Sequence, residues 1–304
     1  MPRSYRYFQL DVFTDRLFGG NQLAVFLDGR GLTSDTMQAV AREMNFSETT
    51  FVLPPERPDT DVRMRIFTPG SEMPIAGHPT IGSTFALARA GVIGAGSNRF
   101  VFGLGAGPTP VSLTWRGAEL AFVWMTQPLP TFFDPLPDEK LAAAALGLPP
   151  HAVIDTGLPV QAASCGVAFL YVPVKTRSAV DAAAVNRPAY DDLMRKTPGA
   201  HGVFVFSPEP GPDEATVYSR NFAPDVGVPE DPATGIASGP LGCYLVRHRV
   251  VPAAGAGAML SLQGAAMGRP SHVHMSIDVD DGGIRSVRVG GEAVLAGEGT
   301  LFIP

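Results

Sequence analysis

The feature that most constrains the fold is a pattern that occurs twice. Residues 65–69 read Arg-Ile-Phe-Thr-Pro, and residues 220–224 read Arg-Asn-Phe-Ala-Pro, 155 positions later. Two further pairs keep this offset, Ile81 with Ile236 and Ser83 with Ser238. Each copy closes a segment of alternating apolar and polar residues, which favours a strand over a helix. Chance similarity in a proline-rich chain is the alternative, but the repeat indicates two halves built on one plan.

The elements around each copy also recur in one order. A helix is predicted at about 79–90, where Gly91 stops it, and another at about 234–248, where Arg247 and His248 suit a helix C-terminus. Upstream, 56–59 and 209–213 are rich in turn-forming residues and are predicted to be hairpin tips. The two halves therefore share a strand, a hairpin tip, a second strand and a helix.

We therefore expect an α+β fold with two pseudo-symmetric lobes, each a bent, mainly antiparallel sheet around one central apolar helix. The predicted lobes are residues 1–127 and 128–290, with 126–137 as a proline-rich linker. A last strand at about 291–304 is expected to cross back to the first lobe. Additional helices are predicted at 34–44 and at about 138–147.

Composition narrows the possible partners. The chain has 304 residues, which fits two lobes better than one compact core, and a net charge of −6 without a Lys/Arg cluster, so nucleic acid is not expected as a partner. No apolar stretch reaches the ~20 residues of a membrane span, and residues 1–7 lack a signal-peptide core. With only two cysteines, Cys165 and Cys243, a reducing compartment is expected. We therefore expect a cytoplasmic protein without a membrane partner.

Clefts between related lobes are common small-molecule sites, and the N-termini of the two central helices would offer free N–H groups to a carboxylate. Three segments carry candidate residues. Glu48 lies where a helix gives way to an apolar strand, and a carboxyl group in such a place can act as acid and base. The first helix N-terminus contains Gly77 and His78, and the second contains Asp231, Thr234 and Gly235.

Each candidate has a structural alternative. Glu48 could be an exposed residue on a turn, and His78 could cap its helix through a backbone group. Asp231 could be the N-cap of the second helix, with Pro232 in the first turn. If they are functional, His78 would donate to a substrate carboxylate or act as a general acid, and Asp231 would hold a substrate ammonium or hydroxyl group.

Two other signals are weak. Residues 103–107 are glycine-rich, but Pro108 and a strand-like segment follow, whereas a phosphate loop should open a helix. His272 and His274 share one face of a predicted strand without an evident third ligand, so no metal site is predicted.

These segments, taken in order, resemble the PhzF family within the diaminopimelate epimerase-like fold. Six segments spanning nearly the whole chain carry the resemblance: 11–14 with 19–21, 46–51, 76–80, 220–224, 231–235 and 267–271. The resemblance implies a homodimer, no cofactor, and a substrate site between the lobes. It also implies an isomerase, because members acting in phenazine biosynthesis move a proton on a dihydro-hydroxyanthranilate through a single Glu.

That Glu matches Glu48, and by the same analogy Gly77, His78 and Asp231 bind the substrate. The expected substrate is a small carboxylate of the amino-acid or hydroxy-acid kind, cyclic ones included. Related epimerases place one cysteine at each central helix N-terminus, and no thiol stands at either turn here. The chain departs from the family at Ile236, where Ser is frequent, and at Cys165, where Thr is common. A non-catalytic member that binds a metabolite or a protein remains the alternative.

Overall fold

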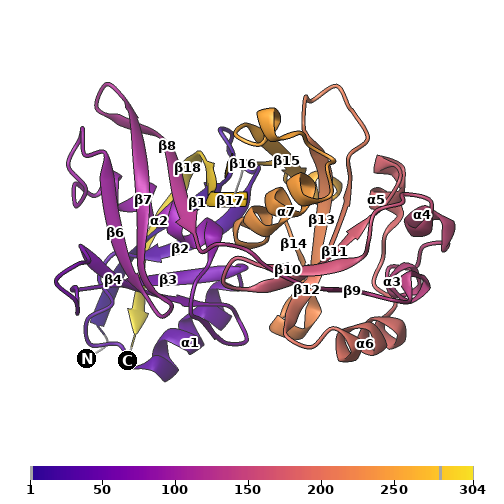
Figure 1. The fold of residues 1–304 in the computed structure, drawn as a ribbon. Coiled ribbons are helices and arrows are strands. Elements are labelled where there is room, and N and C mark those ends of the chain that lie inside the picture. Colours follow the sequence, from indigo (N-terminus) through magenta and orange to yellow (C-terminus); the bar gives the residue numbers. More distant parts are fainter. Residues whose placement is uncertain (1–2, 281–282, 304) are drawn as a thin grey trace.

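The computed structural model describes residues 3–280 and 283–303 and contains two lobes that lie side by side (Figure 1). The α+β class predicted from the sequence is confirmed, because bent sheets of mostly antiparallel strands enclose the central helices. In the region described, no helix is long and apolar enough to cross a membrane.

The N-terminal lobe is one continuous sheet. Its strands, in spatial order, are β18 (Ala293–Ile303), β1 (Arg3–Val12), β2 (Asn21–Phe26), β3 (Glu48–Leu53), β4 (Val62–Phe67), β6 (Arg99–Leu104), β7 (Gly107–Arg116) and β8 (Glu119–Gln127). A short β5 (Glu72–Met73) pairs with β4. The pairs β2–β3 and β4–β6 are parallel, and the others are antiparallel.

The C-terminal lobe repeats this order. Its strands are β9 (Thr131–Pro135), β10 (Gln161–Ser164), β11 (Ala168–Pro173), β12 (Ala200–Ser207), β13 (Val217–Ala223), β15 (Met259–Gln263), β16 (Ser271–Asp280) and β17 (Gly283–Gly291). Here β14 (Val228–Asp231) pairs with β13, and the parallel pairs β11–β12 and β13–β15 stand at the corresponding places. Because β17 also pairs with β8, one sheet runs through both lobes.

Each lobe holds one central helix, α2 (Gly77–Arg89) or α7 (Gly235–Arg247). Both helices are largely buried, and Ile81 and Leu241 belong to the same apolar cluster, so the two cores are continuous. Both predicted helices are confirmed, although α2 begins two residues earlier than predicted. Gly91 follows α2 with a φ of 75°, as expected of a glycine that ends a helix.

The outer helices cover the sheets. They are α1 (Ser34–Met44), α3 (Glu139–Ala145), α4 (His151–Ile154), α5 (Arg177–Ala182) and α6 (Arg187–Lys196). Short 3₁₀ turns occupy Pro224–Val226, Ala253–Gly255 and Ala265–Met267. The first helix has its predicted limits because the Thr33 side chain caps its N-terminus and Asn45 adopts the left-handed conformation at its end.

Two details of the sequence-based prediction were wrong. The segment interpreted as a linker contains β9, which pairs with β10 and belongs to the sheet. The repeat also changes its offset, because α2 and α7 begin 158 positions apart at Gly77 and Gly235. Ile81 and Ile236 therefore do not occupy equivalent positions in their helices. The extra residues lie at the end of β13 and in the longer β14.

Candidate active site

A cavity lies between the lobes at the point where the central helices begin. Glu48, His78 and Met73 line it from the N-terminal lobe, and Asp231 and Ile236 are among its lining residues from the C-terminal lobe. The three segments singled out in the sequence therefore meet at one place. The structure was needed to establish this, since 183 positions separate Glu48 from Asp231 in the chain.

The two helix N-termini approach each other closely through glycines. A Cβ atom placed on Gly77 would lie 2.5 Å from both the carbonyl carbon of Gly235 and the amide nitrogen of Ile236. A larger residue would force the helices apart, because the obstructing atoms are backbone. The first-turn N–H groups of α2 and α7, which lack partners within their helices, are thereby brought to the same cavity.

Glu48 and His78 form the central contact. The Nδ1 atom of His78 lies 3.0 Å from Oε2 of Glu48, and the two side chains are only 2% and 13% exposed, respectively. Glu48 opens β3, and His78 lies in the first turn of α2. The structure thus excludes both structural alternatives. Glu48 is not an exposed turn residue, and the N-cap of α2 is Ala76, without a side-chain capping bond.

Burial raises the pKa of Glu48 above its ordinary value of 4.5. The adjacent His78 opposes this by charge and by its hydrogen bond, while the negative charge of Asp231 adds to the rise. The net direction is upward, so this carboxyl group holds a proton more readily than an exposed glutamate would. A carboxyl group of this kind is suited to exchanging protons near neutral pH.

Asp231 is held by donors from both lobes. Its Oδ1 atom accepts from the Asn21 side-chain amide at 2.7 Å, and its Oδ2 atom accepts from the Thr234 hydroxyl at 2.7 Å. Asn21 also donates to the carbonyl of Ala233 at 2.9 Å, so its amide joins β2 to the start of α7. The N-cap of α7 is Thr234, and the alternative that Asp231 fills this position was wrong.

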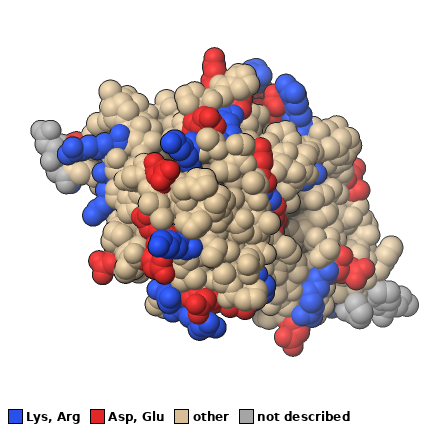
Figure 2. Space-filling model, turned by 90° about the vertical axis from the view of Figure 1, so that its right-hand side faces the viewer, with Lys and Arg blue, Asp and Glu red and all other residues tan. Residues whose placement is uncertain are grey.

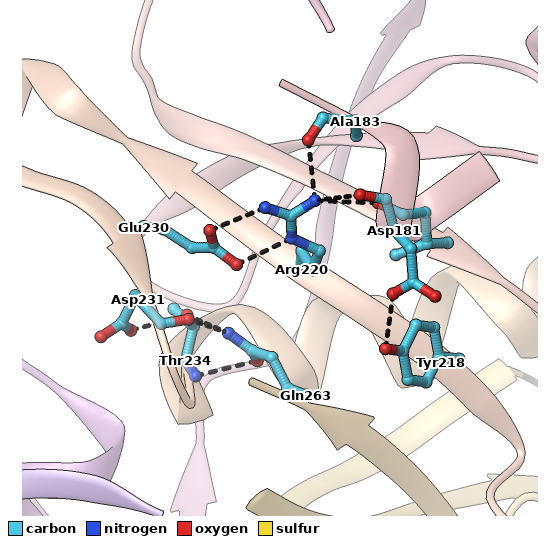
Figure 3. Close-up of polar contacts among 9 residues, drawn as sticks. Asp181, Ala183, Tyr218, Arg220, Glu230, Asp231, Thr234 and Gln263 are labelled. Atoms are coloured by element: carbon cyan, nitrogen blue, oxygen red, sulfur yellow. Dashed lines mark hydrogen bonds and ion pairs between the residues drawn. The ribbon is translucent and has the colours of Figure 1, made fainter. Parts of the chain in front are cut away.

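The turn that carries Asp231 is fixed by Gln263 (Figure 3). The Gln263 amide nitrogen donates to the Asp231 carbonyl at 2.7 Å, and its oxygen accepts from the Thr234 N–H at 3.0 Å. Thr234 therefore has both its N–H and its hydroxyl engaged with protein acceptors, although the sequence suggested it as a substrate donor. The N–H of Gly235, next in the first turn of α7, is better placed for that role.

A largely buried ion pair supports the hairpin beneath Asp231 (Figure 3). Arg220 donates to both carboxylate oxygens of Glu230, each at 2.8 Å, and these side chains are 11% and 18% exposed. Its remaining nitrogen donates to the carbonyls of Val180, Asp181 and Ala183 at the end of α5. Arg220 thus joins β13, β14 and α5 around the residue next to Asp231.

Sequence reasoning missed the roles of Asn21 and Gln263. Asn21 lies in one of the segments that carry the family resemblance. The contacts of this segment with the C-terminal lobe explain how Asn21 is held in place. Arg269 of the C-terminal lobe donates to Asp11 at 2.5 Å and to the Gly19 and Gly20 carbonyls at 2.6 and 2.8 Å. This clamp fixes the loop that presents Asn21 to Asp231. Nothing in the sequence pattern distinguishes Gln263 from other strand residues.

Possible metal ligands do not gather in the part of the chain that the structure describes. Within residues 3–280 and 283–303, no group of three or more His, Cys, Asp or Glu side chains is arranged to hold a metal ion. His274 instead packs edge-on against the rings of Phe122 and Trp124. Cys165 and Cys243 are buried free thiols, and neither stands at the N-terminus of a central helix.

Comparison with known proteins shows the family of the chain. The family model described as phenazine biosynthesis-like protein matches residues 10–299. An uncharacterized isomerase of Mesorhizobium japonicum is 38% identical, with 98% of each chain covered. The trans-2,3-dihydro-3-hydroxyanthranilate isomerase of Pseudomonas aeruginosa is 33% identical over 98% of this chain and 100% of its own. A Bacillus anthracis protein of the PhzF family has a similar structure, with a TM-score of 0.87, 28% identity and coverage of 99% and 100%.

The fold and the matched length together define a PhzF-type isomerase. The chain belongs to the PhzF family, as the resemblance in the sequence indicated.

Proposed function

We propose that this isomerase moves a proton between two carbon atoms of a small carboxylate substrate, with Glu48 as the only acid–base group that touches the moving proton and with no cofactor. The substrate class is an amino-acid-like or hydroxy-acid-like carboxylate, cyclic ones included. The observation that supports this most directly is the shielded Glu48 carboxyl at the meeting point of the two helix N-termini.

The contact with His78 gives the two carboxyl oxygens of Glu48 different roles in this proposal. Nδ1 of His78 lies 3.0 Å from Oε2 of Glu48 and holds the carboxyl group in place. We assign the proton transfer to the other oxygen, Oε1. In the first step a C–H bond breaks, its electron pair enters the conjugated system of the substrate, and Oε1 takes the proton. In the second step Oε1 returns the proton to another carbon, so the carboxylate is restored.

The helix N-termini would hold the substrate carboxylate. The first-turn N–H groups of Gly77 and His78 lie close to those of Gly235 and Ile236, and the positive ends of both helices favour an anion there. Asp231 positions Asn21 and Thr234 through one bond to each of its carboxylate oxygens, and in this proposal its remaining lone pairs accept from a substrate ammonium or hydroxyl group.

The name of the Pseudomonas aeruginosa relative supplies a test substrate. In heavy water, trans-2,3-dihydro-3-hydroxyanthranilate and a panel of small amino and hydroxy acids would be incubated with the enzyme and examined for deuterium uptake by mass spectrometry. Glu48→Gln keeps the shape and the hydrogen bond but removes the relay. We expect isomerisation and exchange to fall by about 10²–10⁴-fold while the variant stays folded. Near-normal turnover by Glu48→Gln on a verified substrate would contradict the proposal.

The proposal also covers the cellular compartment and the oligomeric state. We propose a cytoplasmic homodimer without nucleic-acid or membrane partners. Cys165 and Cys243 are free thiols, which suits a reducing compartment, and basic and acidic side chains are interspersed over the face in Figure 2, which offers no basic surface to nucleic acid. The homodimer is proposed from the family resemblance alone. Cell fractionation and size-exclusion chromatography with light scattering test both points, and a monomer or a periplasmic location would contradict them.

A further inference from the structure

The side chain of Asn221 has no role in the site as described so far. Asn221 lies on β13, is 1% exposed and lines the cavity between the lobes. Within the described part of the chain, its Oδ1 atom has no hydrogen-bond partner. A buried polar atom without a partner costs about 1–3 kcal/mol, so a residue of this kind calls for an explanation.

The fold itself does not require a polar residue here. Arg65 on β4 and Arg220 on β13 are equivalent, because each follows the same pairing scheme and each binds a glutamate on the neighbouring short strand. The next residue is Ile66 in the first lobe and Asn221 in the second. Ile66 is 1% exposed and packs in the apolar core. An apolar side chain therefore suits this position of the sheet.

The strand across from Asn221 strengthens the contrast. Asn221 pairs with Asp231 on β14, whereas Ile66 pairs with Met73 on β5. Asp231 satisfies both of its oxygens with Asn21 and Thr234 and forms no bond to the Asn221 side chain. The Asn221 oxygen is thus an acceptor without a donor. It lies next to Asp231, whose carboxylate oxygens already accept hydrogen bonds.

We infer that Asn221 forms a second polar subsite, which accepts a hydrogen bond from an amine or hydroxyl substituent of the substrate. This inference rests on the proposed function and assigns a residue to the amine or hydroxyl group that its substrate class carries. The helix N-termini take the carboxylate, and Asn221 requires a hydrogen-bond donor elsewhere on the same molecule. Ile236, 6% exposed on the cavity wall, offers no polar group that could replace it.

Calorimetric titration with four simple ring carboxylates tests the inference on the full chain. Benzoate carries the carboxylate alone, anthranilate adds an amine, 3-hydroxybenzoate adds a hydroxyl group, and 3-hydroxyanthranilate adds both. We expect at least one substituent to tighten binding to the wild-type protein by about 10-fold, which is the range of one net hydrogen bond. The substituent that tightens binding, amine or hydroxyl, is the group that the protein recognises.

Asn221→Leu has nearly the same size and no polar atoms. It should bind benzoate as the wild type does, lose the gain from the substituent, and melt no lower than the wild type. Ser219→Ala is the matched control, because Ser219 lies two residues away on β13 and bonds Ser261 at 2.8 Å outside the cavity. This control should keep the gain.

Two results would overturn the inference: a gain that persists in Asn221→Leu, or no gain from any substituent in the wild type. The outcome is separable from that of the proposed function, because Glu48→Gln should keep the full binding gain while losing proton exchange. If Glu48→Gln proved active, the titration would still decide the role of Asn221.

Discussion

The two lobes have the same strand order and the same position for the central helix, yet they contribute different chemistry to the cavity between them. Strand pairing aligns Phe51 with Val205, since each faces the repeated arginine, and this places Gly202 opposite Glu48 in the pseudo-symmetry. The helix starts align His78 with Ile236. Asp231, a polar residue of the second lobe, corresponds to the apolar Met73 of the first lobe.

Each polar group at these positions of the cavity therefore has an apolar or missing counterpart in the other lobe. The position of Gly202 is particularly informative. A Cβ atom there would lie 2.7 Å from the Phe222 carbonyl oxygen, so the second lobe has no room for a side chain opposite Glu48. A site with one acid–base group on one side is suited to moving a proton along one face of a planar substrate. Inversion of a tetrahedral centre would need a second group on the opposite face.

The largest effect on stability should come from exchanging a residue between lobes. Ile66→Asn places in the first lobe the residue that the second lobe has at this position. It removes a buried apolar side chain and leaves an amide without a partner, so the free energy of unfolding should fall by about 3–5 kcal/mol. Urea unfolding of this variant and of Asn221→Leu measures the difference. If Ile66→Asn were as stable as the wild type, the two lobes would not differ in their need for an apolar residue at this position.

A second contrast concerns the repeated arginines. Arg220→Met would leave Glu230, 18% exposed, without its ion partner, and would free three carbonyl groups at the end of α5. We expect a loss of about 3 kcal/mol. Arg65→Met should cost about 1 kcal/mol or less, because its partner Glu72 is 43% exposed and water can replace the arginine. The comparison would fail if chemical denaturation ranked the two variants in the opposite order.

The raised pKa of Glu48 predicts a smaller effect that depends on pH. In the unfolded chain the carboxyl group titrates near 4.5, and in the folded protein at a higher pH. Its contribution to stability is therefore complete below pH 4.5 and is lost as pH rises through the folded-state pKa. The free energy of unfolding of the wild type minus that of Glu48→Gln should decrease from pH 4.5 to 8. A difference that grows with pH would mean that the folded protein lowers this pKa.

The smallest effect is expected at His201, which lines the cavity from the second lobe one residue before Gly202. His201 is an exposed residue of β12, and partial desolvation in the cavity lowers its pKa, so a neutral imidazole is present near neutral pH and is the best candidate for a second base. If Glu48 acts alone, His201→Ala should keep deuterium exchange close to the wild-type rate. A loss as large as that of Glu48→Gln would show that both lobes supply an acid–base group.

Local patterns predicted much of this molecule, because helix caps and strand alternation act over a few residues. The limits of α1, the hairpins that end in Arg65 and Arg220, and the two central helices all follow from such signals. The contacts of Asn21 and Gln263 with the Asp231 turn could not be predicted, since they depend on the register between lobes. Strand β9 was missed because the prolines in and around it indicate a linker, and only its pairing with β10 shows otherwise.

The pairing of β18 with β1 has a consequence for how the chain is made. Strand β1 leaves the ribosome before every other described strand, and its partner along residues 3–12 is the strand at 293–303. Throughout synthesis, one edge of β1 stays open for pairing with other chains. The lobe that begins first is thus completed last, whereas β9 and β10 can pair as soon as residue 164 has emerged. A nascent chain stalled before residue 293 would hold a second lobe close to complete beside a first lobe with an exposed edge, which is the form most prone to aggregate.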